Sequence, residues 1–198
     1  MTHMIEIECK YRLDKGQEEK LIQDAQLFKQ IKNEDSYFDR KNYELTCKNF
    51  WLRKRNGRFE MKVPLPELTG RHFGMTQYRE LETDEAIREE LKLPGNASLE
   101  ADLLSAEYVS FLEIRSERRS YRNGPFRIDL DTTDYGYQIA EIELMIEEKA
   151  DRSAARKQIT DFAESLGIDT SPVRGKILEY LFRYRPEHYQ ALVEAGVI

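Results

Sequence analysis

Charged side chains recur at every second position in several short segments of this 198-residue chain. Near the N-terminus, Glu6, Glu8 and Lys10 alternate with apolar residues. A period of two is that of a β-strand, whose side chains point alternately to its two faces. Each such segment is therefore expected to have one apolar and one charged face. The same spacing places together Arg53 and Arg55, Glu60 and Lys62, Tyr78 and Glu80, Arg127 and Asp129, and Glu141 and Glu143.

Charged faces that carry both carboxylates and cations indicate two bound species. Hard oxygen ligands suit Mg²⁺, and clustered Lys and Arg suit a polyanion such as a triphosphate, which needs several cations to hold one pose. The alternative is a sheet whose charged face is simply in water. Like-charge neighbours such as Glu6 and Glu8, or Arg53 and Arg55, gain nothing on a solvated face. Their repetition favours charged faces that point into an enclosed site.

Composition limits the remaining possibilities. Charged residues make up 34% of the chain, against roughly 25% in an average soluble protein. With 31 Lys and Arg against 37 Asp and Glu, we expect no nucleic-acid partner. Cys9 and Cys47 form no CxxC motif, so ordinary thiols are expected rather than zinc. No apolar run is long enough for a membrane span, and we expect a cytoplasmic monomer.

Alternation, turn residues and helical spacing predict one α+β domain over residues 1–198. Asn56-Gly57 and Asn123-Gly124 indicate hairpins, and Thr83 indicates a helix start. We expect eight antiparallel strands that close into a β-barrel, with helices packed outside and a charged lumen for a small ligand. The expected strands are 5–13, 28–39, 50–55, 58–63, 75–83, 114–121, 126–132 and 137–147. The expected helices are 16–26, 84–93, 98–105, 152–166, 176–184 and 187–195.

The N-terminal Glu6-x-Glu8-x-Lys10 resembles the ExExK signature of the CYTH superfamily, the triphosphate tunnel metalloenzymes. Later segments resemble its tunnel strands in family order: Trp51-Leu-Arg53-Lys-Arg55, Glu60-Met-Lys62, Tyr78-Arg-Glu80, Arg127-Ile-Asp129-Leu-Asp131, Glu141-Ile-Glu143 and Lys176. Asp35-Ser-Tyr37-Phe-Asp39 and Phe182-Arg-Tyr-Arg185-Pro186 are similar to the animal-type thiamine triphosphatase branch. The resemblance extends over nearly the whole chain.

The resemblance implies a role for each matching residue. The Mg²⁺ ligands would be Glu6, Glu8, Asp129, Glu141 and Glu143. The triphosphate would be bound by Lys10, Arg53, Arg55, Lys62, Arg118 and Lys176. Trp51, Tyr37 and Tyr78 would meet the organic end of the substrate, although a lone Trp on a strand is often a core residue. The candidate catalytic residues are Lys10, Arg55 and Glu80.

One strand offers three arginines, Arg115, Arg118 and Arg119. The family spacing selects Arg118, and a four-residue turn around Asn123-Gly124 would place it opposite Asp129. Arg127 is open between a structural and a phosphate-binding role.

Other polar residues are expected to have structural or surface roles. Asp131 and Asp134 are expected to cap the turn before Gly136. The three histidines, His3, His72 and His188, are expected at the surface.

The resemblance implies Mg²⁺-dependent hydrolysis of thiamine triphosphate to thiamine diphosphate and phosphate. Two alternatives remain, an inorganic tripolyphosphatase and a non-catalytic polyphosphate-binding module; a nucleotide cyclase is less expected. A binding module would keep the cations but could lose the metal-binding acids. All of these acids are present, which favours catalysis.

Overall fold

A computed structural model describes residues 4–64, 78–95, 97–147 and 149–198. They form two compact units. The first unit comprises the chain up to Lys32 together with Ser116–Glu179, and the second comprises Asn33–Arg115 and Tyr180–Ile198. The single domain expected over residues 1–198 stays a prediction.

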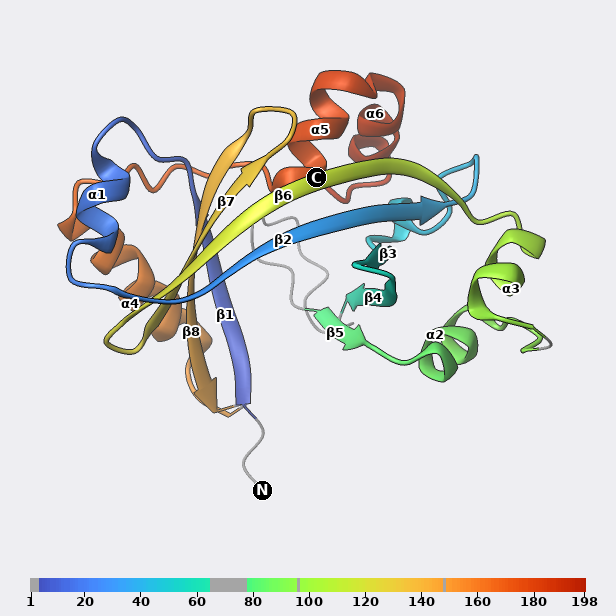
Figure 1. Ribbon diagram of the computed structural model, residues 1–198, viewed down its shortest axis with the longest axis horizontal. Coiled ribbons are helices and arrows are strands. Elements are labelled where there is room, and N and C mark those ends of the chain that lie inside the picture. Colours follow the sequence, from blue (N-terminus) through green and yellow to red (C-terminus); the bar gives the residue numbers. More distant parts are fainter. Residues whose placement is uncertain (1–3, 65–77, 96, 148) are drawn as a thin grey trace. The chain divides into compact units, whose positions relative to one another are not determined.

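Among the described residues, eight strands are hydrogen-bonded in the order β1-β8-β7-β6-β2-β3-β4-β5 (Figure 1). The strands are β1 (Met4–Tyr11), β2 (Gln26–Asp39), β3 (Trp51–Arg55), β4 (Arg58–Pro64), β5 (Tyr78–Leu81), β6 (Val109–Asn123), β7 (Phe126–Thr133) and β8 (Gln138–Glu147). Strands β2 and β6 have residues in both units. The α+β class and the eight-stranded antiparallel sheet are confirmed, whereas closure into a barrel is not shown by the strand order.

The first unit has its core on the apolar face of β1, β7 and β8. Ile7, Cys9 and Tyr11 of β1 are buried there with Ile128 and Ile142. Helix α4 (Arg152–Ser165) covers this face, lying beside β1 and β8 (Figure 1), and helix α1 (Gln17–Ile22) adds Leu21 to the same core. The other face of these strands carries the charged residues. The predicted alternation thus separates a hydrophobic layer from a charged one.

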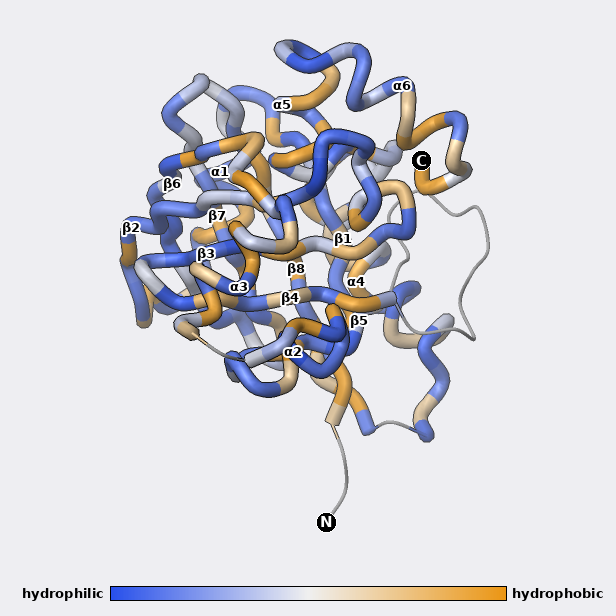
Figure 2. Tube along the Cα trace, turned by 90° about the vertical axis from the view of Figure 1, so that its right-hand side faces the viewer, coloured by the Kyte–Doolittle hydropathy of each residue, from blue (hydrophilic) through white to orange (hydrophobic). Residues whose placement is uncertain are grey.

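The second unit has a separate core behind β3, β4 and β5. Leu52, Phe59 and Met61 pack there with residues of helices α2 (Asp84–Leu91) and α3 (Leu99–Ser105). Figure 2 shows hydrophobic and hydrophilic residues alternating along β4. The unit also contains the short helix η1 (Thr46–Lys48) and helix α6 (Pro186–Glu194). Helix α5 (Lys176–Tyr184) begins in the first unit and ends in the second.

Local signals located the turn of one hairpin and the start of helix α2 correctly. The β3–β4 hairpin turns at Asn56 and Gly57, whose φ angles of 47° and 86° are both left-handed, as a two-residue hairpin turn of this kind requires. Thr83 Oγ1 accepts a hydrogen bond from Ala86 N at 3.2 Å and caps α2. Helix α2 ends at Leu91, two residues earlier than predicted, because Lys92 adopts the left-handed conformation that ends a helix.

The expectation that His188 lies at the surface is wrong. Its side chain is buried, with the residue only 3% exposed, and its ring stacks on Tyr43 at a centroid distance of 3.9 Å. His188 Nε2 lies 2.7 Å from Thr46 Oγ1, which donates to Asp39 Oδ2 at 2.7 Å. Because the hydroxyl has a single proton, Nε2 must donate to Thr46. His188 therefore joins α6 to η1 inside the second unit.

Some predicted features lie outside the described residues. These are His3, His72, the start of the strand expected over 75–83, and most of the loop that begins at Pro64. Cys9 and Cys47 are free thiols, as expected. Within the described part of the chain, no helix is both long and apolar enough to cross a membrane.

Candidate active site

Five carboxylates meet on the charged face of the first unit. The antiparallel register pairs Glu8 with Glu143 and pairs Asp129 with Glu141. Two acid groups result, Glu6–Glu8–Glu143 and Asp129–Glu141–Glu143, and within each group one oxygen from each carboxylate lies within 4.8 Å of those of the other two. Glu143 belongs to both. The structure thus brings together the five acids that the sequence suggested as metal ligands.

The two acids of β8 have opposite electrostatic surroundings although both are buried. Burial, together with the charges of Glu6 and Asp129, raises the pKa of Glu143 to about 8. Burial alone would also raise the pKa of Glu141, but Lys176, Lys10 and Arg118 hold it well below the usual range. Negative charge is therefore compensated by cations at Glu141 and less so at Glu143.

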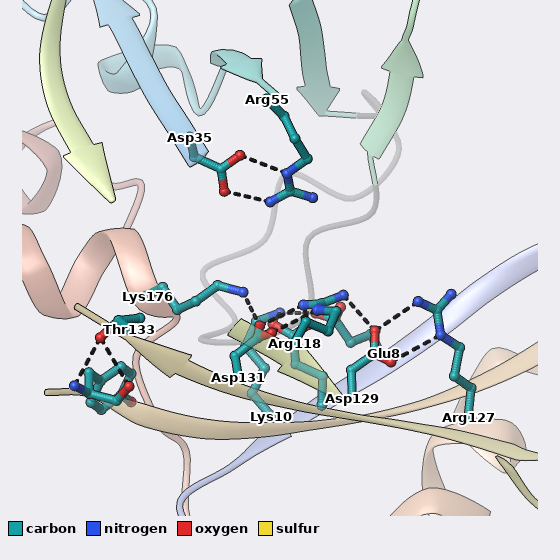
Figure 3. A network of polar contacts seen from close by, with 12 residues as sticks. Glu8, Lys10, Asp35, Arg55, Arg118, Arg127, Asp129, Asp131, Thr133 and Lys176 are labelled. Atoms are coloured by element: carbon teal, nitrogen blue, oxygen red, sulfur yellow. Dashed lines mark hydrogen bonds and ion pairs between the residues drawn. The ribbon is translucent and has the colours of Figure 1, made fainter. Parts of the chain in front are cut away.

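Arg118 lies at the centre of the acid cluster (Figure 3). Its Nε and Nη2 donate to the two oxygens of Asp131 at 2.7 and 2.6 Å. Its Nη1 donates to Asp129 Oδ2 at 2.5 Å, and Nη2 also donates to Glu141 Oε2 at 2.5 Å. Such charge-assisted bonds orient the planar guanidinium strongly. Arg118 is thus held by three carboxylates.

The other two candidate arginines lie elsewhere. Arg119 Nη2 donates to Glu18 Oε1 at 2.7 Å. The side chain of Arg115 is 75% exposed, and its Nε lies 3.5 Å from Glu34 Oε1. Of the three candidates, Arg118 is the one that the structure brings into the acid cluster, as expected from the family spacing.

The expected register of this hairpin is wrong by two residues. Asn123 pairs with Phe126, so the connection has two residues rather than four. Arg118 consequently stands opposite Asp131, and Ser120 stands opposite Asp129. Arg118 still reaches Asp129, because a long side chain spans the diagonal to a residue two positions along the neighbouring strand.

The expectation that Asp131 caps a turn is also wrong. It does not cap the turn before Gly136, because Thr133 does so: Tyr137 N donates to Thr133 Oγ1 at 2.9 Å. Asp131 is buried and accepts hydrogen bonds from Arg118 and from Lys176 Nζ. Its alternation with Asp129 along β7 was the signal that could have assigned it to the charged face.

Three further cations contact the cluster. Lys10 Nζ forms an ion pair with Glu8 and lies 3.9 Å from Glu141 Oε1. Lys176, the first residue of α5, contacts Asp131. Arg127 donates to both oxygens of Asp129, at 3.1 and 2.9 Å (Figure 3). Burial lowers the pKa of Arg127, yet the nearby Glu143 and Asp129 raise it overall, which suits a residue that neutralises the acid cluster.

The predicted cations of the second unit are each paired with an acid. Arg55 donates from Nε and Nη2 to Asp35, both at 2.6 Å. Arg53 Nε donates to Glu60 Oε2 at 2.8 Å. Asp35 and Glu60 were not among the predicted site residues. Because each arginine and its partner are on neighbouring strands, their pairing depends on strand register and could not be read from either segment alone.

Lys62 and Glu80 also pair across the β4–β5 register, with Lys62 Nζ 2.8 Å from Glu80 Oε1. Burial raises the pKa of Glu80, but Lys62, Arg53 and Arg55 lower it overall. Glu80 is therefore a carboxylate held in its charged form by the cations of its own unit.

The predicted aromatic residues lie on the same charged side as these cations. Trp51 is 7% exposed, and Tyr37 is buried opposite Arg53. Neither belongs to the two hydrophobic cores. Trp51 Nε1 and Tyr78 OH both donate to Asn49 Oδ1 at 2.8 Å. The shared acceptor fixes the edges of the indole and phenol rings, and Lys62 Nζ lies over the Tyr78 ring, 5.8 Å from its centroid.

The donor chemistry of the acid cluster fits a divalent cation. Carboxylate oxygens are the ligands that Mg²⁺ accepts, together with water. Ser120, which stands opposite Asp129, is completely buried, and its Oγ has no hydrogen-bond partner in the described part of the chain. A buried hydroxyl normally has a hydrogen-bond partner. Glu6, Glu8, Asp129, Glu141 and Glu143 could hold a metal ion here.

Comparisons with known proteins identify the family of the chain. Residues 4–173 match the model of the family described as the CYTH domain. The chain is 31% identical to a thiamine-triphosphatase of Macaca fascicularis over 214 residues, covering 98% of this chain and 91% of that protein. The thiamine-triphosphatase of Homo sapiens matches with the same identity and coverage. Among solved structures, a protein from Pyrococcus horikoshii OT3 has a TM-score of 0.66 at 20% identity, covering 91% of this chain and 100% of that one, and shows a similar fold.

Proposed function

Because the chain belongs to the CYTH domain family, we propose that it is a triphosphate hydrolase that uses Mg²⁺ and acts on thiamine triphosphate. One observation carries the proposal: five carboxylates suited to a hard cation lie beside two cations suited to phosphate, Arg118 and Lys10, while a third cation, Lys176, contacts the neighbouring Asp131. The names of the relatives support thiamine triphosphate as the substrate.

The acids Glu6, Glu8, Asp129, Glu141 and Glu143 would hold the metal. When bound there, Mg²⁺ would neutralise negative charge on the phosphate oxygens. The protein's other contribution would be to position the reacting groups, which is a large part of how phosphoryl transfer is catalysed. In the reaction, water adds to the terminal phosphorus, the bond from that phosphorus to the bridging oxygen breaks, and thiamine diphosphate, phosphate and a proton are released.

Arg118 and Lys176 are proposed to bind the terminal phosphates. Both are already oriented by Asp131, so little side-chain freedom would be lost when phosphate binds. Lys10 is proposed to act beside them. In the second unit, Arg53, Arg55 and Lys62 stay the predicted phosphate ligands. Lys10, Arg55 and Glu80 stay the candidate catalytic residues.

The organic end of the substrate would contact Trp51, with Tyr37 and Tyr78 as further candidates. The thiazolium ring of thiamine is a permanent cation, and an indole face attracts such a cation. An inorganic tripolyphosphatase remains the second candidate, since it would need the same charged residues without the aromatic ones. We retain a cytoplasmic monomer without nucleic-acid or membrane partners as part of the proposal.

The test is phosphate release from thiamine triphosphate, tripolyphosphate and ATP, each with Mg²⁺ and with EDTA. We expect Mg²⁺-dependent release that is fastest with thiamine triphosphate. Faster release from tripolyphosphate would establish the second candidate. Binding of these compounds without any release would identify a polyphosphate-binding module and overturn the hydrolase.

A further inference from the structure

The segment Arg174–Lys176, called the strap below, accepts hydrogen bonds from two tyrosine hydroxyls of the first unit. Tyr135 OH donates to the backbone carbonyl of Lys176 at 2.6 Å, and Tyr137 OH donates to that of Arg174 at 2.7 Å. The family match ends at residue 173, directly before the strap. The two hydroxyls thus bond to the residues on both sides of Gly175.

Both tyrosines are themselves held by the turn between β7 and β8. Thr133 N donates to Tyr137 O at 2.9 Å, and Tyr137 N donates to Thr133 Oγ1 at 2.9 Å. Gly136, with a φ of 78°, permits the turn. The two rings lie nearly parallel, 6.2 Å apart at their centroids. The strap is therefore anchored to the strand that carries Asp129 and Asp131.

The strap in turn places one of the cations that contact the acid cluster and packs against a second. Lys176 reaches Asp131 from the last residue of the strap. A Cβ atom at Gly175 would lie 3.5 Å from Lys10 Cε, so this backbone packs against the Lys10 side chain. Glu179 N donates to Gly175 O at 2.9 Å, which begins α5 on the strap. The position of Lys176 thus follows the position of the strap backbone.

We propose that Tyr135 and Tyr137 are positioning residues that hold Lys176 ready for phosphate. This inference rests on the proposed function, in which Lys176 binds the triphosphate. A lysine has a flexible side chain, and a cation whose backbone is already fixed loses less freedom on binding. Tyr137 also satisfies the carbonyl of Arg174, which precedes helix α5. Removing the two hydroxyls should free the strap and weaken triphosphate binding, and the loss should arise only from the displacement of Lys176.

The test is a double-mutant cycle with tripolyphosphate as the probe, its dissociation constant measured by calorimetry in EDTA. The variants are Tyr135→Phe/Tyr137→Phe, Lys176→Ala, and the triple variant that combines them. We expect the tyrosine pair to weaken binding roughly two- to tenfold, the range for lost hydrogen bonds, and Lys176→Ala to weaken it more. The triple variant should equal Lys176→Ala, because residues that act through one another are not additive.

Additive losses would overturn the positioning role and leave the proposed function intact. If Lys176→Ala binds tripolyphosphate as tightly as the wild type, or if the wild type does not bind it, then Lys176 has no role in phosphate binding and the inference fails with it. A second readout is hydrogen exchange at the Glu179 amide, which should quicken in the tyrosine variants; unchanged exchange contradicts the strap. Tyr121→Phe removes a matched hydroxyl that contacts Arg119 and should leave both readouts unchanged. If the double variant does not fold, Tyr135→Phe alone is measured in the same way.

Discussion

Arg118 and Asp131 face each other across β6 and β7 and share two parallel hydrogen bonds, at 2.7 and 2.6 Å. Both residues are largely buried, and Lys176 contacts the same carboxylate. Removing one partner of a buried ion pair leaves an uncompensated charge. Asp131 is therefore expected to contribute to stability as well as to the orientation of two cations.

The first prediction is that Asp131→Ala lowers the free energy of unfolding by about 3 kcal/mol, at the lower end of values for broken buried ion pairs. Urea denaturation measures it. The matched control is Asp134→Ala, which removes an exposed acid three residues away and should change stability little. Equal effects of the two variants would show that Asp131 is not held as the structure indicates.

The second prediction concerns the metal. Glu6→Gln should lower Mg²⁺-dependent turnover at least about a hundredfold, because it removes an anionic oxygen from the acid group that includes Glu8 and Glu143. Stability should persist, since one charge leaves a set of like charges. Phosphate release and thermal denaturation measure the two effects. Glu18→Gln, which alters an acid paired with Arg119, should keep normal turnover; a Glu6→Gln variant that does so too would rule out this metal site.

The third prediction separates the arginines of β6. Arg118→Ala should slow turnover about ten- to a hundredfold, the range for a lost charge-assisted hydrogen bond. Arg119→Ala should have little effect, because Arg119 pairs with Glu18 away from the cluster. Steady-state kinetics of both variants provide the comparison. The reverse ranking would contradict the observed β6 register.

The fourth prediction concerns selectivity. Trp51→Ala should lower kcat/KM for thiamine triphosphate about tenfold, from the usual strength of a cation–π contact. Tripolyphosphate has no ring, so its kcat/KM should change far less. The ratio of the two values is the measurement. Equal losses would identify Trp51 as a packing residue, consistent with its low exposure.

The fifth prediction is a loss of stability in acid caused by His188. Burial lowers its pKa to about 4 and outweighs the opposing charge of Asp39, while Arg185 adds to the lowering. The unfolded chain takes up the proton near pH 6.5, so stability is complete above that pH and falls as the pH drops towards 4. The loss should approach about 3 kcal/mol. Urea denaturation of wild type and His188→Gln between pH 7 and 4 tests it, since the variant should lack this part of the pH dependence.

The sequence alone located most of the strands and helices of the chain, because these depend on local properties. Alternation separated the core face from the charged face, as Ile7 and Glu8 illustrate. The turn residues Asn56 and Gly57 adopt the left-handed conformations that only a few residues favour. The same alternation, with the family resemblance, selected the five acids that the structure gathers.

Only the tertiary structure decided which charges meet. A two-residue connection after Asn123 moved Arg118 from Asp129 to Asp131, and a shift of two residues keeps the same face, so the alternation could not reveal it. The burial of His188 depends on Tyr43 and Thr46, more than 140 positions away in the chain. The strap depends on tyrosines about 40 positions before it. These contacts join distant segments, whose partners are set by packing and register rather than by local pattern.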